Sequence, residues 1–163
     1  LAAYADTVKQ LLGSRPLKLI LEPGRSLVGN AGNLLTRVEF IKSNGDKQFV
    51  IVDAAMNDLM RPALYQAYHH IENAEESDTA PFSADIVGPI CETGDFFARD
   101  REIAAQAGDL LVIRSAGAYS ASMGSNYNAR VKPAEVLVNG SEVKLIRRRE
   151  TLEQLMQNEL DCL

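Results

Sequence analysis

Hydrophobic and polar residues follow two different patterns along this chain. Over residues 2–13 apolar side chains recur at roughly helical spacing, and Pro16 ends the predicted helix. Residues 17–21 are apolar except for Lys18, which is typical of a buried strand, and a polar loop follows them. A helix, a buried strand and a polar loop at the strand's carboxyl end predict one unit of a parallel α/β fold over residues 1–33.

From residue 34 onward the pattern changes to short strands separated by turn signals. Asn-Gly at positions 44–45 and 139–140 is typical of tight hairpins. Residues 72–80 are acidic and predict an exposed loop, and residues 150–157 predict a short closing helix. This spacing predicts a mainly β domain over residues 34–163, an antiparallel, Greek-key-like barrel or sandwich. The expected strands are 34–41, 48–53, 82–87, 109–114, 135–139 and 142–147.

Composition excludes several classes of protein. Hydrophobic residues make up 46% of the chain and the net charge is −5, which gives no general attraction to nucleic acid or to an anionic membrane. No apolar run approaches the ~20 residues that a membrane span needs, and no secretory signal is visible. Cys91 and Cys162 make no disulfide framework, so we expect a reducing, cytoplasmic compartment. Because residue 1 is leucine, we expect the chain to start inside a longer protein.

The stretch Cys91-Glu92-Thr93-Gly94-Asp95 places a thiol beside a carboxylate, directly after a predicted strand. Loops at strand ends are where rigid scaffolds hold reactive groups, and a cysteine there can give or take a proton. The alternative is a half-buried cysteine in a turn, with Glu92 and Asp95 solvated. The pentapeptide alone favours this alternative, whereas its combination with the segments below favours the reactive cysteine.

The loop after residues 17–21 reads Glu22-Pro23-Gly24-Arg25, where a parallel α/β fold holds its ligands. Glycine lets the backbone approach a bound group closely, and Arg25 offers a planar fork for a phosphate or carboxylate. An ionised Glu22 stabilises a proton on an adjacent ring nitrogen. A turn with an internal Glu–Arg ion pair explains this motif equally well.

Two later segments carry side chains suited to an anionic or aromatic ligand. Arg61 and Tyr65 share one face if residues 61–65 are helical, and together they suit a carboxylate. In isolation, a solvated arginine and a half-buried tyrosine explain this segment better. The small residues 115–118 bring the backbone close to another group and present Tyr119, whose phenol can donate to a phosphate or stack on a ring.

Motifs for metal or nucleotide binding are missing from the sequence. His69 and His70 are adjacent and point in different directions on a helix or a strand, and no other spacing completes a ligand set. The chain also lacks a Walker-type or GxGxxG loop. We therefore expect no metal.

Four of these segments, taken together and in their order along the chain, resemble motifs of the diaminopimelate decarboxylase family. This family belongs to the pyridoxal-phosphate-dependent decarboxylases that are built like alanine racemase. The similarity runs through the whole chain and implies a two-domain enzyme. Its N-terminal α/β barrel would hold pyridoxal 5′-phosphate, with residues 1–33 as the last barrel unit, and residues 34–163 would form most of the C-terminal β domain. The motifs are EPGR at 22–25, RPALY at 61–65, CETGD at 91–95 and GAY at 117–119.

The resemblance implies a role for each matching residue. It implies that Glu22 faces the ring nitrogen of the cofactor and that Arg25 lies near the cofactor phosphate. Pro23, Gly24 and Tyr119 are the other implied cofactor contacts. The implied substrate contacts are Arg25, Arg61, Tyr65, Glu92 and Tyr119.

The resemblance also implies a site shared between two subunits. Cys91 would be the proton donor and Glu92 would contact the distal amino end of the substrate, both at the neighbouring subunit's cofactor, so a homodimer is expected. Asp95 matches the motif and receives only a structural role.

The expected reaction is decarboxylation of meso-diaminopimelate to L-lysine and CO2, in lysine biosynthesis. None of the 6 lysines stands in a motif suited to holding the cofactor. The resemblance places that lysine and the phosphate loop upstream of residue 1, so we expect this chain alone to be inactive. The alternatives are a decarboxylase of arginine, ornithine or carboxynorspermidine, a non-catalytic homologue that acts as a binding or regulatory partner, and a plain β interaction module.

Overall fold

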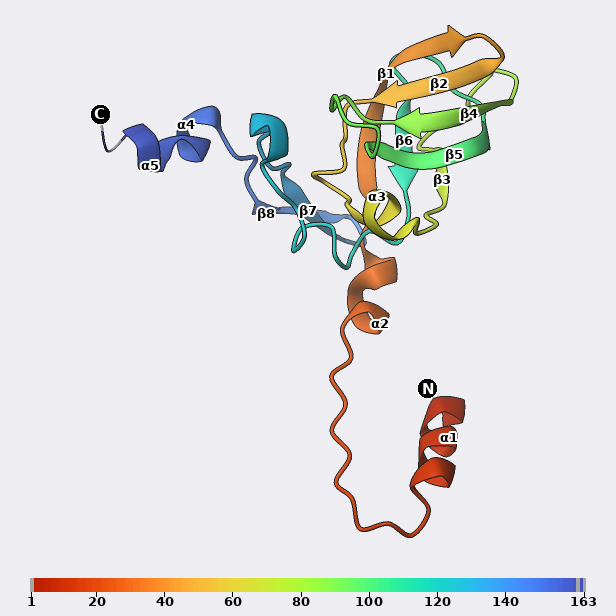
Figure 1. Ribbon diagram of the computed structural model, residues 1–163, viewed down its shortest axis with the longest axis vertical. Helices are drawn as coiled ribbons and strands as arrows, with labels where there is room; N and C mark the ends of the chain where they lie inside the picture. Colours follow the sequence, from red (N-terminus) through yellow and green to blue (C-terminus); the bar gives the residue numbers. More distant parts are fainter. Residues whose placement is uncertain (1, 161, 163) are drawn as a thin grey trace.

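The computed structural model describes residues 2–160 and residue 162. Its centre is a six-stranded sheet in the order β3-β6-β1-β2-β4-β5, which curls into a nearly closed barrel (Figure 1). The mainly β fold class is therefore confirmed. The strands are β1 (Leu34–Asn44), β2 (Lys47–Val52), β3 (Ile71–Asn73), β4 (Phe82–Val87), β5 (Phe96–Ile103) and β6 (Leu110–Ile113).

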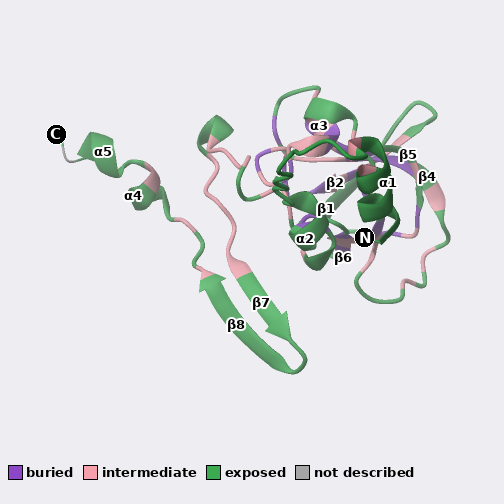
Figure 2. Cartoon of the chain, turned by 90° about the horizontal axis from the view of Figure 1, so that it is seen from below, coloured by how far each residue is buried: buried purple, intermediate pink, exposed green. Residues whose placement is uncertain are grey.

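The core lies inside this barrel, where the buried residues gather in Figure 2. Alternate residues of β1 and β2 point inward, because successive side chains of a strand face opposite sides of the sheet. Thr36 and Val38 of β1 and Val50 and Val52 of β2 are buried in this way. Phe97 of β5 is the largest of the fully buried side chains.

One strand pair departs from the antiparallel prediction. β2 and β4 pair in parallel, with Val50 opposite Ile86, while the other neighbours in the sheet are antiparallel. A parallel pair needs a crossover connection, and residues 53–81 make it. This crossover contains α3 (Arg61–Tyr65), so the RPALY segment is helical, the condition under which Arg61 and Tyr65 share one face.

Both predicted hairpins form. Asn44 pairs with Lys47 and Asn139 pairs with Glu142, so each loop has two residues and begins with glycine. Gly45 and Gly140 each have a φ of 59°, the conformation that the first position of a type II′ turn requires. The glycine of each Asn-Gly pair, with no Cβ to clash, therefore sets the turn.

The second hairpin lies outside the barrel. β7 (Glu135–Asn139) and β8 (Glu142–Arg147) form a separate two-stranded sheet that projects away from it (Figure 2). The apolar side chains on both of its faces are exposed, and these two predicted strands pair with each other and not with the strands of the barrel. The exposed side chains are Val136, Leu137, Val138, Val143, Leu145 and Ile146.

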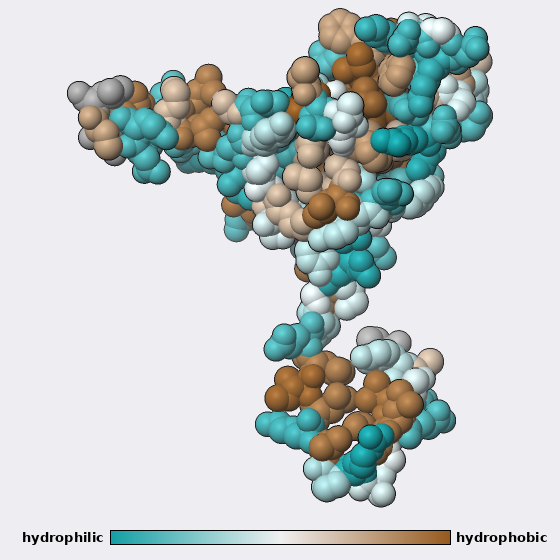
Figure 3. Space-filling model, viewed as in Figure 1, coloured by the Kyte–Doolittle hydropathy of each residue, from teal (hydrophilic) through white to brown (hydrophobic). Residues whose placement is uncertain are grey.

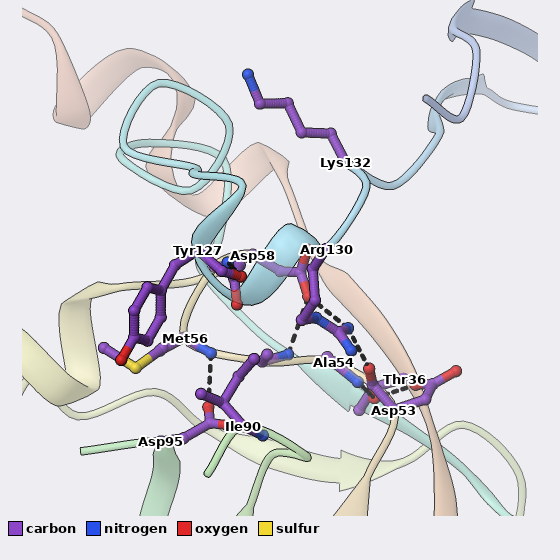
Figure 4. Close-up of polar contacts among 12 residues, drawn as sticks. Thr36, Asp53, Ala54, Met56, Asp58, Ile90, Asp95, Tyr127, Arg130 and Lys132 are labelled. Atoms are coloured by element: carbon purple, nitrogen blue, oxygen red, sulfur yellow. Dashed lines mark hydrogen bonds and ion pairs between the residues drawn. The ribbon is translucent and has the colours of Figure 1, made fainter. Parts of the chain in front are cut away.

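Polar contacts attach the segment before β7 to the barrel (Figure 4). This segment contains the short helix η2 (Tyr127–Ala129). Arg130 donates to the carbonyl oxygen of Asp53 at 2.7 Å, and Asn57 donates to the carbonyl oxygen of Tyr127 at 2.9 Å. These bonds reach the part of the crossover that leads to α3.

Two strands and one helix break were not predicted. β5 contains four charged residues among eight, which hide its alternation at the edge of the sheet, and β3 is only three residues long. The first two residues of the predicted acidic loop, Glu72 and Asn73, belong to β3. The closing helix begins at Leu152 and divides into α4 (Leu152–Leu155) and α5 (Gln157–Leu160), and the side chain of Thr151 caps its start.

The N-terminal part contains the predicted helix but not the predicted strand. α1 (Ala2–Leu12) is followed by an extended link to α2 (Arg25–Val28) and η1 (Gly29–Ala31). A strand needs a neighbouring strand to hydrogen-bond with. In the part of the chain that the structure describes, no strand pairs with residues 17–21. Ile20 is 70% exposed, and apolar side chains gather on this part of the molecule (Figure 3). No described helix has the length and apolarity of a membrane span.

We expect Phe97→Ala to lower the free energy of unfolding by about 3–5 kcal/mol, because it removes a fully buried ring and leaves a cavity. Chemical denaturation of the chain measures this loss. The matched control is Phe40→Ala on β1, where the ring is 64% exposed and a change within about 0.5 kcal/mol is expected. Equal losses for the two variants would contradict this account of the core.

Candidate active site

A pocket of about 910 Å³ lies where the N-terminal segment, α3 and the loop after β6 meet. Of the residues predicted for the site, it brings together Gly24, Arg25, Arg61, Tyr65 and Tyr119. These come from three segments that are far apart in the sequence. The rest of the lining was not predicted as site residues and comprises Ser26, Gly29, Asn30, Tyr68, His69, Ser115 and Met123.

Arg61 lies near two aromatic rings. Its guanidinium carbon lies 5.9 Å from the ring centre of Tyr65, on the same short helix, and 5.4 Å from that of Tyr119. The helix forms with proline in its first turn, where the missing N–H has no helical partner. Rings at this distance attract and orient a cation, so the guanidinium fork is held ready for a carboxylate or phosphate.

The glycine of GAY allows two backbone segments to touch. The N–H groups of Ala116 and Gly117 donate to the carbonyl oxygens of Gly32 and Gly29, at 2.8 and 3.0 Å. A Cβ atom at Gly117 would lie 1.9 Å from the carbonyl oxygen of Val28. The sequence indicated that the small residues 115–118 bring the backbone close to another group, and that group is the segment that follows Arg25.

Hydrogen bonds hold the segment before Tyr119 at this junction in a strained backbone conformation. The hydroxyl of Ser115 donates to the side-chain oxygen of Asn30 at 3.0 Å. Ser115 and Tyr119 have φ values of 59° and 64°, in the left-handed region that costs a non-glycine residue about 1–3 kcal/mol. The surrounding contacts hold both residues there, and Tyr119 faces the same pocket as Arg25.

Glu22 and Pro23 are not among the residues that line this pocket. Both lie exposed in the extended link before α2, one or two residues from Gly24. Among the described residues no ion pair joins Glu22 to Arg25. The alternative explanation of this motif, a turn closed by an internal Glu–Arg ion pair, is therefore not what the structure contains. The place of these two residues depends on the link, which has no neighbouring strand here.

Cys91 and Glu92 lie on a different surface. Glu92 lines a second pocket of about 420 Å³, which shares no lining residue with the first. Its carboxylate accepts hydrogen bonds from the Thr93 hydroxyl at 3.2 Å and from the Gly94 N–H at 3.1 Å. Cys91 is exposed, so the alternative of a half-buried packing cysteine is wrong. Within one chain the thiol and the first pocket are therefore separate.

Asp95 is buried, in contrast to the solvated carboxylate of that alternative. Its two oxygens accept the N–H groups of Met56 and Ile90, each at 2.7 Å (Figure 4). Burial raises the pKa of the Asp95 carboxyl above its usual value, and the two N–H donors lower the pKa in part. The structural role expected for Asp95 agrees with these contacts.

His69 forms part of the pocket wall and was missed as a site residue. It is 4% exposed, and its Nδ1 lies 2.9 Å from the carbonyl oxygen of Arg114, which accepts only, so Nδ1 carries the proton. His70 is exposed and contacts Glu72 at 3.1 Å, so the two histidines diverge as expected. Over residues 2–160 and 162, no group of three metal-ligating side chains occurs.

The geometry defines a class of site. Two guanidinium groups and three tyrosines share a pocket with a small-residue backbone wall, which suits an aromatic ligand that carries a phosphate and a partner that carries a carboxylate. A family model described as "Pyridoxal-dependent decarboxylase, C-terminal sheet domain" matches residues 5–117. The chain belongs to the pyridoxal-dependent decarboxylases and contains their C-terminal sheet domain.

Individual relatives agree with this family. The chain is 72% identical over 163 residues to a diaminopimelate decarboxylase of Neisseria meningitidis serogroup A, and 55% identical over 156 residues to that of Pseudomonas aeruginosa. These alignments cover 100% and 96% of the chain and 40% and 38% of the relatives. The chain thus spans about two fifths of the length of these proteins.

Solved structures match the fold over nearly the whole chain. A crystal structure of an Aquifex aeolicus protein is 54% identical, with a TM-score of 0.91, and the match covers 98% of this chain and 40% of that one. A Helicobacter pylori diaminopimelate decarboxylase complexed with L-lysine is 41% identical, with a TM-score of 0.89, and the match covers 99% of this chain and 40% of that one.

Gly117→Ala should destabilise the chain by about 1–3 kcal/mol, because the added methyl group meets a backbone carbonyl that cannot rotate away. Thermal and chemical denaturation measure the change. Gly24→Ala is the control, since a Cβ atom there meets nothing within 4 Å. If Gly117→Ala proved as mild as Gly24→Ala, the close contact would not hold the N-terminal segment to the barrel.

Proposed function

We propose that this chain is the C-terminal part of a pyridoxal 5′-phosphate-dependent diaminopimelate decarboxylase, which converts meso-diaminopimelate to L-lysine and CO2. The observation that supports this most is the single pocket in which Arg25, Arg61, Tyr65 and Tyr119 meet. Three separate motifs supply these residues. Relatives that align with the whole chain are named for this activity.

We further propose that residues 1–33 end an α/β barrel and that residues 34–163 form the β domain. Residues 1, 161 and 163 of these ranges lie outside the described residues. The apolar link at 17–21 and the exposed hairpin β7–β8 suit burial against further chain, and the curated relatives are longer by more than half their length. The lysine that attaches the cofactor would lie in that further part, so this chain alone is not expected to decarboxylate.

The pocket residues fit the proposed cofactor. Arg25 would pair with its phosphate, and the uncovered backbone at Gly24 leaves room for that group. Tyr119 would contact the cofactor and the substrate. Glu22, with Pro23 beside it, would keep the ring nitrogen protonated once the link takes its place in the barrel. When bound, pyridoxal phosphate accepts the electrons that CO2 leaves behind on the substrate carbon.

The remaining residues would hold the substrate and return a proton. Arg61 and Tyr65 would bind the distal carboxylate, with the guanidinium oriented by its two rings. Glu92 would accept from the distal ammonium group, and the Cys91 thiol would donate a proton to the carbon that lost CO2. Because both lie on a surface separate from the first pocket, a homodimer that places this loop at its partner's pocket accounts for the arrangement.

In the full-length enzyme, Cys91→Ala should slow CO2 release from meso-diaminopimelate by about 100-fold or more, because it removes a general acid. The absorbance of the bound cofactor should stay normal, since the thiol takes no part in holding it. Cys162→Ala is the control, and it should retain full turnover. Normal turnover of Cys91→Ala would remove this thiol from the proposed role.

Arg61→Met should raise the KM for meso-diaminopimelate by about 100-fold, because the distal carboxylate loses a charged bidentate partner. Steady-state kinetics measure the change, and cofactor affinity reports whether the pocket stays intact. Arg148→Met, at an exposed position after β8, is the matched loss of one positive charge and should leave KM unchanged. An unaltered KM in Arg61→Met would assign the distal carboxylate to another residue.

A further inference from the structure

Asp95 connects the loop that contains Cys91 to the segment that leads to α3. It is 3% exposed, and its carboxylate accepts the N–H of Ile90, the residue before Cys91, and the N–H of Met56, both at 2.7 Å. Ile90 and Met56 are 34 positions apart in the sequence. One buried side chain therefore holds two segments that belong to different surfaces of the protein.

Backbone bonds close the loop around this carboxylate. The N–H of Asp95 donates to the carbonyl oxygen of Glu92 at 3.0 Å, and the N–H of Gly88 donates to that of Asp95 at 3.0 Å. A Cβ atom at Gly88 would lie 2.3 Å from the carboxylate. The absence of a side chain at Gly88 leaves room for the Asp95 carboxylate. Asp95 points into the protein, whereas Cys91 and Glu92 are exposed.

We infer that Asp95 is a positioning residue for Cys91, a role that rests on the proposed function of the thiol. Its carboxylate holds the peptide before Cys91 against the crossover that supplies Arg61 to the other pocket. The proton-donating loop thus takes its position from the same barrel that positions the carboxylate-binding helix. Hydrogen bonds to a charged acceptor are among the stronger ones, and the bond from Ile90, the residue next to Cys91, is buried.

The experiment is a double-mutant cycle in the full-length enzyme loaded with pyridoxal phosphate. Asp95→Asn keeps the shape of the side chain and replaces one of its two acceptor oxygens by a donor. It should lower kcat for meso-diaminopimelate by about 10- to 100-fold, the effect of displacing a reacting group by about 1 Å. In a Cys91→Ala background the same substitution should change kcat less than about twofold.

Asp85→Asn is the matched control. Asp85 is 6% exposed on β4, accepts the N–H of Asp100 at 2.9 Å and pairs with Lys47 at 2.8 Å, so it is also a buried carboxylate bonded to backbone. The Asp85→Asn substitution should lower the melting temperature. It should not lower kcat by a factor that disappears in the Cys91→Ala background. Melting temperature and cofactor absorbance check that each variant folds. If Asp95→Asn does not fold, Gly88→Ala displaces the same carboxylate and enters the same cycle.

The outcomes separate the two proposals. Normal turnover of Cys91→Ala would overturn the role of the thiol, and the inference about Asp95 with it. A large loss in Cys91→Ala, together with an Asp95→Asn loss of the same factor in both backgrounds, would overturn only the inference, since Asp95 would then act independently of Cys91. Wild-type kcat in Asp95→Asn would also overturn it.

Discussion

The contact between two glycine-containing backbones is the constraint on which the candidate site depends. Gly29 and Gly32, after Arg25, accept hydrogen bonds from Ala116 and Gly117, before Tyr119. The two segments approach too closely for a Cβ atom at either Gly32 or Gly117. This contact joins the N-terminal segment to the barrel, and without it Arg25 and Tyr119 would share no pocket.

The third segment of the pocket, α3, takes its position from the parallel pair of strands in the barrel. Because β2 and β4 run in the same direction, the chain between them must cross over, and the crossover contains α3 with Arg61 and Tyr65. The same segment provides the Met56 N–H that reaches Asp95 in the other loop. The strand order of the sheet therefore decides which polar side chains can meet.

Sequence patterns predicted much of this and failed where pairing decides the outcome. The hairpins at Gly45 and Gly140, the N-terminal helix and the mainly β class were all predicted, because each depends on local conformation or periodicity. The apolar run 17–21 was read as a buried strand, but a strand exists only where neighbours supply hydrogen bonds. β5 was missed since its outward charges hide its alternation.

The amino-acid sequence by itself determined which chemical groups are available: a thiol beside a carboxylate, two arginines and two tyrosines in recognisable motifs, and glycines where the backbone must turn or touch. The tertiary structure alone decided which of these groups meet. It gathers Arg25, Arg61 and Tyr119 in one pocket, leaves Cys91 on a separate surface and buries Asp95 beneath that loop. Motif order fixes no distances, because they are set by strand pairing and by close backbone contacts between segments far apart in the chain.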